Sequence, residues 1–456
     1  MLDLFLIIIF TFLGVLTGIL TGLIPGLHVN NIALIMLSLT PTIFSSLYFL
    51  TGLGFPKEFI FLLISIFIIG ISVSHTFHDF IPTTFIGAPD ADTALSVLPA
   101  HKLMLQGKGY ESIVLSGMGS FGAIIFCFLV FIPARYLLGK PFLLYEELRE
   151  IMPWLLIAIS LIMICTEKAK IDIFSKKGKI PSITGILFAF FVFILSGIFG
   201  LAITELTVFS PIGLFSPVLF PALTGLFGVP ALIDSLQKKP NIPKQNLTKP
   251  EIKEKNERKS SIFSIITGSI GGILVSIIPG ITSATGTVLA MNMRGQNNKE
   301  NEKNDFNEKQ TIMTLSSVNT ASAFFVIVVL FIILRPRSGA AIAVNDLIAV
   351  QQWNALSIPL NLSYILISLI LSGLLSYFFV LKTGKIFAKY FTDLPYLKVV
   401  EFTLILVFSL VFIFTGFTGL LILVVATFIG LMPVYWGVRR SHCMGVLLIP
   451  IILFFI

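Results

Sequence analysis

The sequence predicts an all-α polytopic membrane protein that contains two helices broken at a Pro-Gly pair. Of its 456 residues, 56% are hydrophobic and 12% are charged, and the mean hydropathy is +0.98. A soluble domain carries roughly 25% charged residues, so lipid is the expected solvent. Thirteen apolar runs approach the bilayer length of roughly 20 residues, and from them we expect about ten to twelve membrane spans. In addition, a segment near the start of the chain recurs near its middle.

The apolar runs are separated by short polar connections. They lie near residues 4–24, 29–50, 59–77, 112–133, 151–165, 181–203, 206–233, 262–291, 312–334, 357–381, 399–415, 417–436 and 443–456. Only Asp3 precedes the first run, and no small-residue cleavage site follows it, so we expect a retained segment rather than a signal peptide. Cys127, Cys165 and Cys443 show no metal-ligand spacing and are interpreted as small core residues.

Basic residues are confined to the connections, which indicates membrane topology rather than nucleic-acid binding. We interpret residues 237–260 as a basic cytoplasmic linker between a first transmembrane repeat, 1–236, and a second, 261–456. The apolar run after this linker is followed by another polar stretch, 294–310, so both of its flanks are basic. A hairpin keeps both flanks on one side of the membrane, and its expected apex is Pro279-Gly280.

An internal repeat connects the two halves. Residues 14–26 (GVLTGILTGLIPG) align without gaps with residues 268–280 (GSIGGILVSIIPG), including both Pro-Gly pairs. The first copy has no basic flank before Lys57, whereas the second is flanked on both sides, which fits opposite orientations. Inverted repeats whose broken helices meet at mid-membrane are typical of secondary transporters. We therefore predict an inverted-repeat arrangement.

Polar side chains follow each predicted break. The candidate ion or substrate ligands here are Pro25, Gly26, His28, Asn30 and Asn31 in the first half, and Pro279, Gly280, Thr282 and Ser283 in the second. A broken helix exposes backbone groups, and these side chains can complete a coordination shell. The alternative is that the Asn, Ser and Thr residues cap the restarted helix.

The densest polar cluster ends the third apolar run. Its candidate residues are Ser74, His75, His78 and Asp79, followed by Asp90 and Asp92. Ionisable groups in an apolar span are costly unless they face a cavity or a partner, so we interpret them as a proton relay or as ion and substrate contacts. A metal site lacks further ligands and is not expected. An interfacial polar cap without a transport role is the remaining alternative.

A comparable uncharged cluster, with Ser317, Asn319 and Thr320 as its candidate residues, lies within a span of the second half. It could join helices by hydrogen bonds alone. In a two-fold arrangement it would form the other wall of the site. Arg335 and Arg337 are expected to snorkel at a membrane edge, the alternative being attraction of an anionic substrate.

Several motifs resemble those of the TctA family, the large permease subunit of tripartite tricarboxylate transporters. They are residues 22–26 (GLIPG), 85–95 (FIGAPDADTAL), 98–109 (LPAHKLMLQGKG), 220–230 (FPALTGLFGVP) and 278–282 (IPGIT). The resemblance implies a membrane permease and covers roughly residues 14 to 330. Asp90 and Asp92 stand where the family's loop is usually small and neutral. Added carboxylates repel a tricarboxylate unless a cation pairs with them. We therefore expect a divergent branch of the family, one that works without the binding-protein partner of the tripartite system.

The leading prediction is a secondary carrier of the cell membrane that moves a small organic anion, such as a carboxylate, by alternating access. Protons or Na⁺ are the expected coupling ions, and no other cofactor is expected. The expected partners are the lipid bilayer, an anionic or lipid-like substrate and a small membrane subunit, without nucleic acid. The alternatives are a carrier of an amphiphilic anion such as polyprenyl phosphate, a scaffold protein, and a membrane enzyme that uses His75, His78 and Asp79 in acid-base chemistry.

Overall fold

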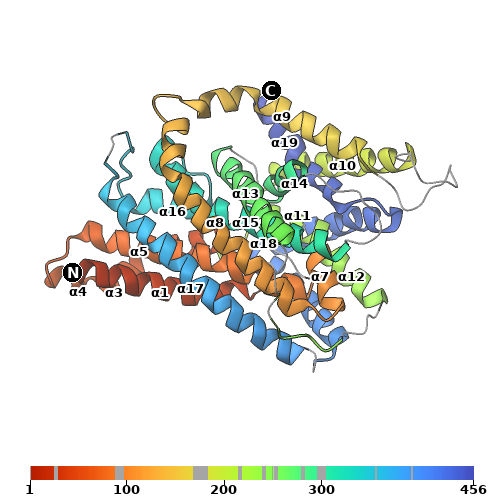
Figure 1. The fold of residues 1–456 in the computed structure, drawn as a ribbon, viewed down its shortest axis with the longest axis horizontal. Coiled ribbons are helices and arrows are strands. Elements are labelled where there is room, and N and C mark those ends of the chain that lie inside the picture. Colours follow the sequence, from red (N-terminus) through yellow and green to blue (C-terminus); the bar gives the residue numbers. More distant parts are fainter. Residues whose placement is uncertain are drawn as a thin grey trace.

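The computed structural model describes residues 2–24, 29–87, 97–167, 183–213, 218–238, 243–248, 250, 255–278, 283–294, 304–354, 357–391 and 394–456. Every regular element within these ranges is a helix (Figure 1). Nine of the described helices are long and apolar enough to cross a membrane, or ten if the bent pair Ile32–Ser38 and Thr40–Gly52 forms one span. The all-α polytopic class is thereby confirmed.

The helices follow one another from the N-terminus to the C-terminus. They are α1 (Leu2–Gly22), α2 (Val29–Ser38), α3 (Thr40–Leu47), α4 (Phe49–Gly52), α5 (Lys57–His78), α6 (Phe80–Phe85), α7 (Val97–Leu105), α8 (Gly109–Leu138), α9 (Leu144–Cys165), α10 (Ile183–Thr204), α11 (Leu219–Leu223), the π-helix η2 (Thr224–Gly228), α12 (Val229–Lys238), α13 (Lys255–Ile277), α14 (Ser283–Arg294), α15 (Asn304–Ile333), α16 (Gly339–Leu347), α17 (Leu360–Phe391), α18 (Tyr396–Trp436), the 3₁₀-helix η3 (Arg440–Met444) and α19 (Gly445–Phe455).

Four of the predicted spans differ in form from the sequence expectation. The runs 206–233 and 443–456 correspond to shorter apolar helices, Leu219–Asp234 and Arg440–Phe455. The runs 399–415 and 417–436 join in α18, whose 41 residues are interrupted at Gly416, where φ is 63° and ψ is −158°. A straight helix of that length would measure about 60 Å, twice the roughly 30 Å of a bilayer core. The glycine therefore divides α18 where the sequence placed a boundary.

In the first half, α1 lies parallel to α5 at backbone contact. An added Cβ on Gly14 would lie 2.4 Å from the Phe67 carbonyl oxygen, and one on Gly18 would lie 2.6 Å from that of Ile71. Only glycine permits this approach along the α1 face. After α1 the chain returns through α2 to α4, and the Phe44 ring stacks on Phe61 of α5 at 4.9 Å.

The second half repeats this contact in the same register. An added Cβ on Gly268 of α13 would lie 2.4 Å from the Thr314 carbonyl oxygen, and one on Gly272 would lie 2.4 Å from that of Val318. These glycines align with Gly14 and Gly18 in the internal repeat. The identical positions in the repeat therefore mark the same helix contact in both halves.

Helix α14 packs antiparallel to α13, as the two basic flanks predicted. An added Cβ on Gly286 would lie 2.3 Å from Val275 Cγ2 and 3.0 Å from the Gly271 carbonyl oxygen, while one on Gly271 would lie 3.1 Å from the Ala290 Cβ. The expected apices, residues 25–26 and 279–280, lie outside the described residues.

The helix pairs α1–α5 and α13–α15 run in opposite directions. The end of α6, which continues α5, meets α7 at Thr84, whose carbonyl oxygen accepts a hydrogen bond from His101 Nδ1 at 3.2 Å. The start of α15 meets the same helix α7 through the Lys102–Glu308 ion pair. Since α5 ends where α15 begins, α1 and α5 are inverted relative to α13 and α15. This supports the predicted inverted repeat, whose boundaries stay a prediction.

The glycine contacts generate the first test. Gly272→Ala forces a methyl group against the Val318 backbone, and overpacking of this kind costs about 1–3 kcal/mol. We expect a lower Tm for the purified variant in detergent. Gly52→Ala is the matched control, because an added Cβ there meets nothing within 4 Å. Equal melting temperatures for the two variants would contradict the close α13–α15 contact.

Candidate functional site

The two polar clusters predicted from the sequence meet where α5 crosses α15. The Asn319 side-chain amide donates a hydrogen bond of 3.0 Å to Asp79 Oδ2. The hydroxyl oxygens of Thr76 and Thr320 lie 3.2 Å apart beside it. All four side chains are buried, with Asp79 4% and Asn319 5% exposed. The carboxylate and the amide therefore face each other across the contact between the two inverted halves.

Two histidines extend this cluster toward α1. His75 Nδ1 lies 3.2 Å from the Thr21 hydroxyl oxygen. His78 Nδ1 lies 2.8 Å from the Ser74 carbonyl oxygen, and because a carbonyl only accepts, Nδ1 carries the proton of this bond. Nε2 of His78 is buried and has no hydrogen-bond partner among the described residues. In the neutral imidazole this nitrogen is therefore the proton acceptor.

The end of α1 lies at the level of Asp79. An added Cβ on Gly22, the last residue of the helix, would lie 2.8 Å from the His78 Cβ and 3.1 Å from the Asp79 backbone nitrogen. The predicted Pro25-Gly26 break follows within a few residues. The first helix thus stops beside the buried carboxylate.

Two of the predicted site residues hold helices together. Ser74 Oγ donates to the Val15 carbonyl oxygen at 2.9 Å and joins α5 to α1. Ser317 Oγ lies 2.9 Å from the Gly119 carbonyl oxygen and 2.7 Å from that of Met313, which joins α15 to α8. Their positions match the helix-packing alternative for Ser and Thr residues in membrane spans.

Asn30 caps a helix, although a different one from that expected. Its Oδ1 accepts a hydrogen bond of 2.9 Å from the Gly339 amide at the start of α16. Ser338 caps the same helix end by accepting from the Ala341 amide at 3.1 Å. Asn30 therefore connects the returning chain of the first half to α16.

Ser283 opens α14 and is buried, and the nearby Thr285 and Thr287 hydroxyls are buried without a hydrogen-bond partner among the described residues. The remaining predicted site residues, Pro25, Gly26, His28, Asp90, Asp92, Pro279, Gly280 and Thr282, together with the Asn31 side chain, lie outside the described part of the chain. Their roles stay predictions. Among the described residues, no three His, Cys, Asp or Glu side chains gather as a metal site would require.

A second buried polar cluster was not predicted. Glu167 Oε2 lies 2.5 Å from His442 Nε2 and 2.7 Å from Arg439 Nε. Burial raises the pKa of the Glu167 carboxyl, but the hydrogen bonds and charges of His442 and Arg439 outweigh burial and lower it from 4.5 to about 2. Arg439 and His442 lie 272 and 275 positions after Glu167 in the sequence, so no local motif could reveal the cluster. A single Glu beside an apolar run was the available signal.

Cys127 and Cys443 are buried as expected, whereas the expectation of a core position was wrong for Cys165, which is exposed at the end of α9.

Residues 8–445 match the Tripartite tricarboxylate transporter TctA family. The chain belongs to this family. An uncharacterized protein of Methanocaldococcus jannaschii is 28% identical over 457 residues, which cover 98% of this chain and 99% of that relative. No solved structure matches. TctA membership confirms the family resemblance and agrees with a multi-pass membrane transporter component rather than an enzyme.

The Glu167 cluster predicts a pH-dependent stability. Because the folded pKa, about 2, lies below the ordinary 4.5, the ionised carboxylate stabilises the fold above about pH 4.5, and this contribution is lost as the pH falls toward 2. We expect Glu167→Gln to destabilise the purified protein by about 2 kcal/mol near neutral pH and progressively less below about pH 4. Thermal unfolding across this range checks it.

Glu58→Gln is the control for this test, since Glu58 is exposed and makes no ion pair within the described residues. If the stability difference between Glu167→Gln and the parent protein stayed the same at all pH values, the assigned role of the carboxylate would be contradicted.

Proposed function

We propose that this TctA-family protein is the membrane permease of a secondary transporter that moves a small organic anion, such as a carboxylate, together with protons or Na⁺. The observation that carries the proposal is the Asp79–Asn319 hydrogen bond between two helices of opposite direction. As the family name implies a tripartite system, we also propose that a small membrane subunit acts with it.

A carboxylate in this position favours cation coupling. Asp79 is buried in a membrane span, where an ionised group is stable only with a partner or a bound cation. An anionic substrate would be repelled by the ionised carboxylate at short range. Binding of a proton or Na⁺ removes this repulsion, so cation binding is expected to precede binding of the anion. That order is what couples the two fluxes.

Residues beside Asp79 supply what such a site needs. His78, the residue before Asp79 in the sequence, offers a buried nitrogen acceptor on its imidazole. Thr76, Thr320 and the Asn319 amide add uncharged ligands that suit both Na⁺ and a carboxylate oxygen. The nearby end of α1 would add free backbone groups, as broken helices do in other carriers.

The arrangement also suits alternating access. Hydrogen bonds between small polar side chains join α5 to α15, whereas glycine-mediated backbone contact joins each of them to its own partner, α1 or α13. The α5–α15 crossing is therefore easier to separate than either of these glycine contacts. Helix α8 joins the halves more closely, since an added Cβ on Gly119 would lie 2.5 Å from the Met313 carbonyl oxygen of α15. Rocking of one half against the other would expose Asp79 first to one side and then to the other.

Uptake into proteoliposomes tests this function. Purified protein should accumulate one of a panel of mono-, di- and tricarboxylates when a proton or Na⁺ gradient is imposed. We expect Asp79→Asn to lower gradient-driven uptake at least tenfold, because the replacement amide cannot bind and release a cation. Asp346→Asn, the same chemical change at an exposed position of α16, should leave uptake unchanged.

A charge exchange sharpens the test. Asn319→Asp alone places two carboxylates at hydrogen-bond distance and should reduce uptake. The double variant Asp79→Asn/Asn319→Asp restores one carboxylate facing one amide and should recover part of it. A double variant no better than Asp79→Asn would contradict the paired role. Chemical conversion of the solute without net movement would instead favour an enzyme.

A further inference from the structure

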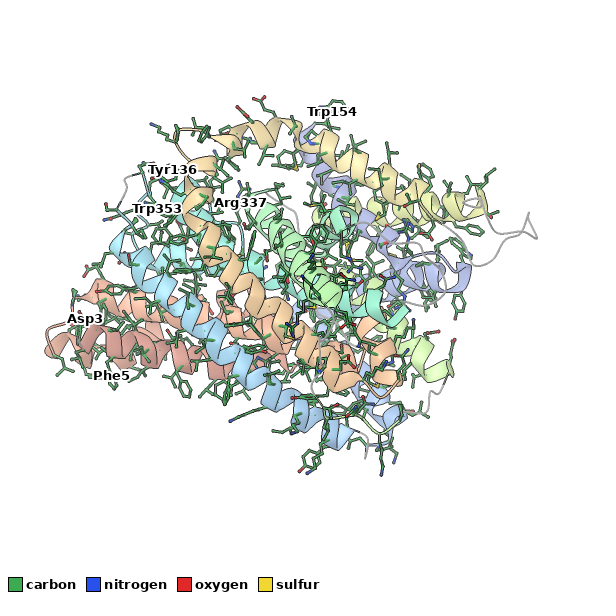
Figure 2. All side chains as sticks on the ribbon, in the orientation of Figure 1. Asp3, Phe5, Tyr136, Trp154, Arg337 and Trp353 are labelled. Atoms are coloured by element: carbon green, nitrogen blue, oxygen red, sulfur yellow. The ribbon has the colours of Figure 1, made fainter. Side chains whose placement is uncertain are left out.

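Arginines gather around one tyrosine at the start of α9. The Arg337 guanidinium donates a hydrogen bond to the Tyr145 hydroxyl. The guanidinium carbons of Arg337 and Arg335 lie 5.3 and 6.0 Å from the centroid of the Tyr145 ring. Tyr145 is buried, Arg337 is half-buried and Arg335 is exposed. Figure 2 shows Arg337 at the same end of the molecule as Tyr136 and Trp353, where α8 ends.

Three glutamates, Glu146, Glu147 and Glu150, follow Tyr145 on α9, but within the part of the chain that the structure describes no ion pair joins them to these arginines. Burial lowers the pKa of the Arg337 guanidinium, Tyr145 opposes that change, and the neighbouring charges of Arg335 and Arg149 add to it. None of the three arginines forms an ion pair with a carboxylate among the described residues. In addition, Arg337 Nε is buried without a hydrogen-bond partner in that part of the chain. A bound oxyanion would offset the repulsion and accept this unused donor.

The cluster lies at the end of the molecule opposite the basic linker. Helix α8 starts beside that linker, where the Gly109 amide donates to Gln245 Oε1 at 2.8 Å. It then runs for 30 residues, about 45 Å, and ends at Leu138, close to the α9 start. The bias of basic residues toward the linker side therefore does not explain these arginines.

Exposed apolar side chains surround the cluster. Phe142 is 65% exposed and Leu143 47% exposed in the α8–α9 connection, and Leu334 beside Arg335 is 43% exposed. Trp154, farther along α9, is 69% exposed. In a membrane protein such surfaces face lipid, and tryptophan favours the interface. The occupant must therefore carry both an anionic group and hydrocarbon.

We propose that Arg149, Arg335, Arg337 and Tyr145 bind the phosphate group of an anionic membrane lipid at this corner. The guanidinium groups are suited to two-point contact with phosphate oxygens, and the Tyr145 hydroxyl holds Arg337 in place. The acyl chains lie along the exposed face of α9. The site is separate from Asp79 and does not depend on the transport proposal.

Thermal unfolding of the full-length protein in detergent tests this site. The probes are dihexanoyl phosphatidylglycerol, dihexanoyl phosphatidylcholine and inorganic phosphate, each titrated against parent protein, Arg335→Gln, and Arg335→Gln/Arg337→Gln. We expect phosphatidylglycerol to raise the Tm at lower concentrations than the other two probes. Arg335→Gln, at an exposed position, should raise the phosphatidylglycerol concentration that gives half of the Tm increase about threefold. The double change should raise this concentration about tenfold. Arg258→Gln, an exposed arginine at the start of α13, is the control and should have no effect.

Phosphatidylglycerol binding that is unchanged in both arginine variants would overturn the proposal. Equal stabilisation by inorganic phosphate would also overturn it, because the site would then bind a free anion rather than a lipid. Equal stabilisation by phosphatidylcholine would overturn the requirement for net negative charge.

Discussion

Backbone contact along glycine faces is the constraint on which the rest of this structure depends. Gly14 and Gly18 bring α1 against α5, and Gly268 and Gly272 bring α13 against α15. Lipid tails are as apolar as the side chains that face them, so moving apolar side chains from lipid into a helix contact gains little free energy. Close packing of small residues is therefore a main source of helix association in a membrane. Each broken helix is thereby fixed to a continuous one, so its end falls at a defined depth in the protein.

This depth explains where the polar residues lie. Helix α1 ends against His78 and Asp79, and α15 presents Asn319 and Thr320 to the same place from the inverted half. A buried carboxylate contributes little to the stability of a membrane protein, so its position between two oppositely directed units is better explained by function. In the function that we propose, this one charge accounts both for coupling to a cation and for the order in which the anion binds.

The sequence predicted the features that depend on local pattern. Composition indicated the membrane class, the repeat at 14–26 and 268–280 marked equivalent contacts, and the basic flanks of α13 and α14 predicted their hairpin. The sequence did not predict which residues far apart in the chain form hydrogen bonds with each other. The partner of Asp79 is 240 positions away, and that of Glu167 is 275 positions away. Asn30 likewise bonds to α16, because caps between distant helices leave no trace in spacing.

Two-sided accessibility at the crossing of α5 and α15 is the most direct test of alternating access at Asp79. Thr320→Cys would be introduced after replacing Cys127, Cys165 and Cys443 with serine, and labelled with a membrane-impermeant thiol reagent from each side of oriented vesicles. We expect labelling from both sides, in proportions that shift with an imposed proton or Na⁺ gradient. Labelling from neither side, or from one side under every gradient, would contradict it.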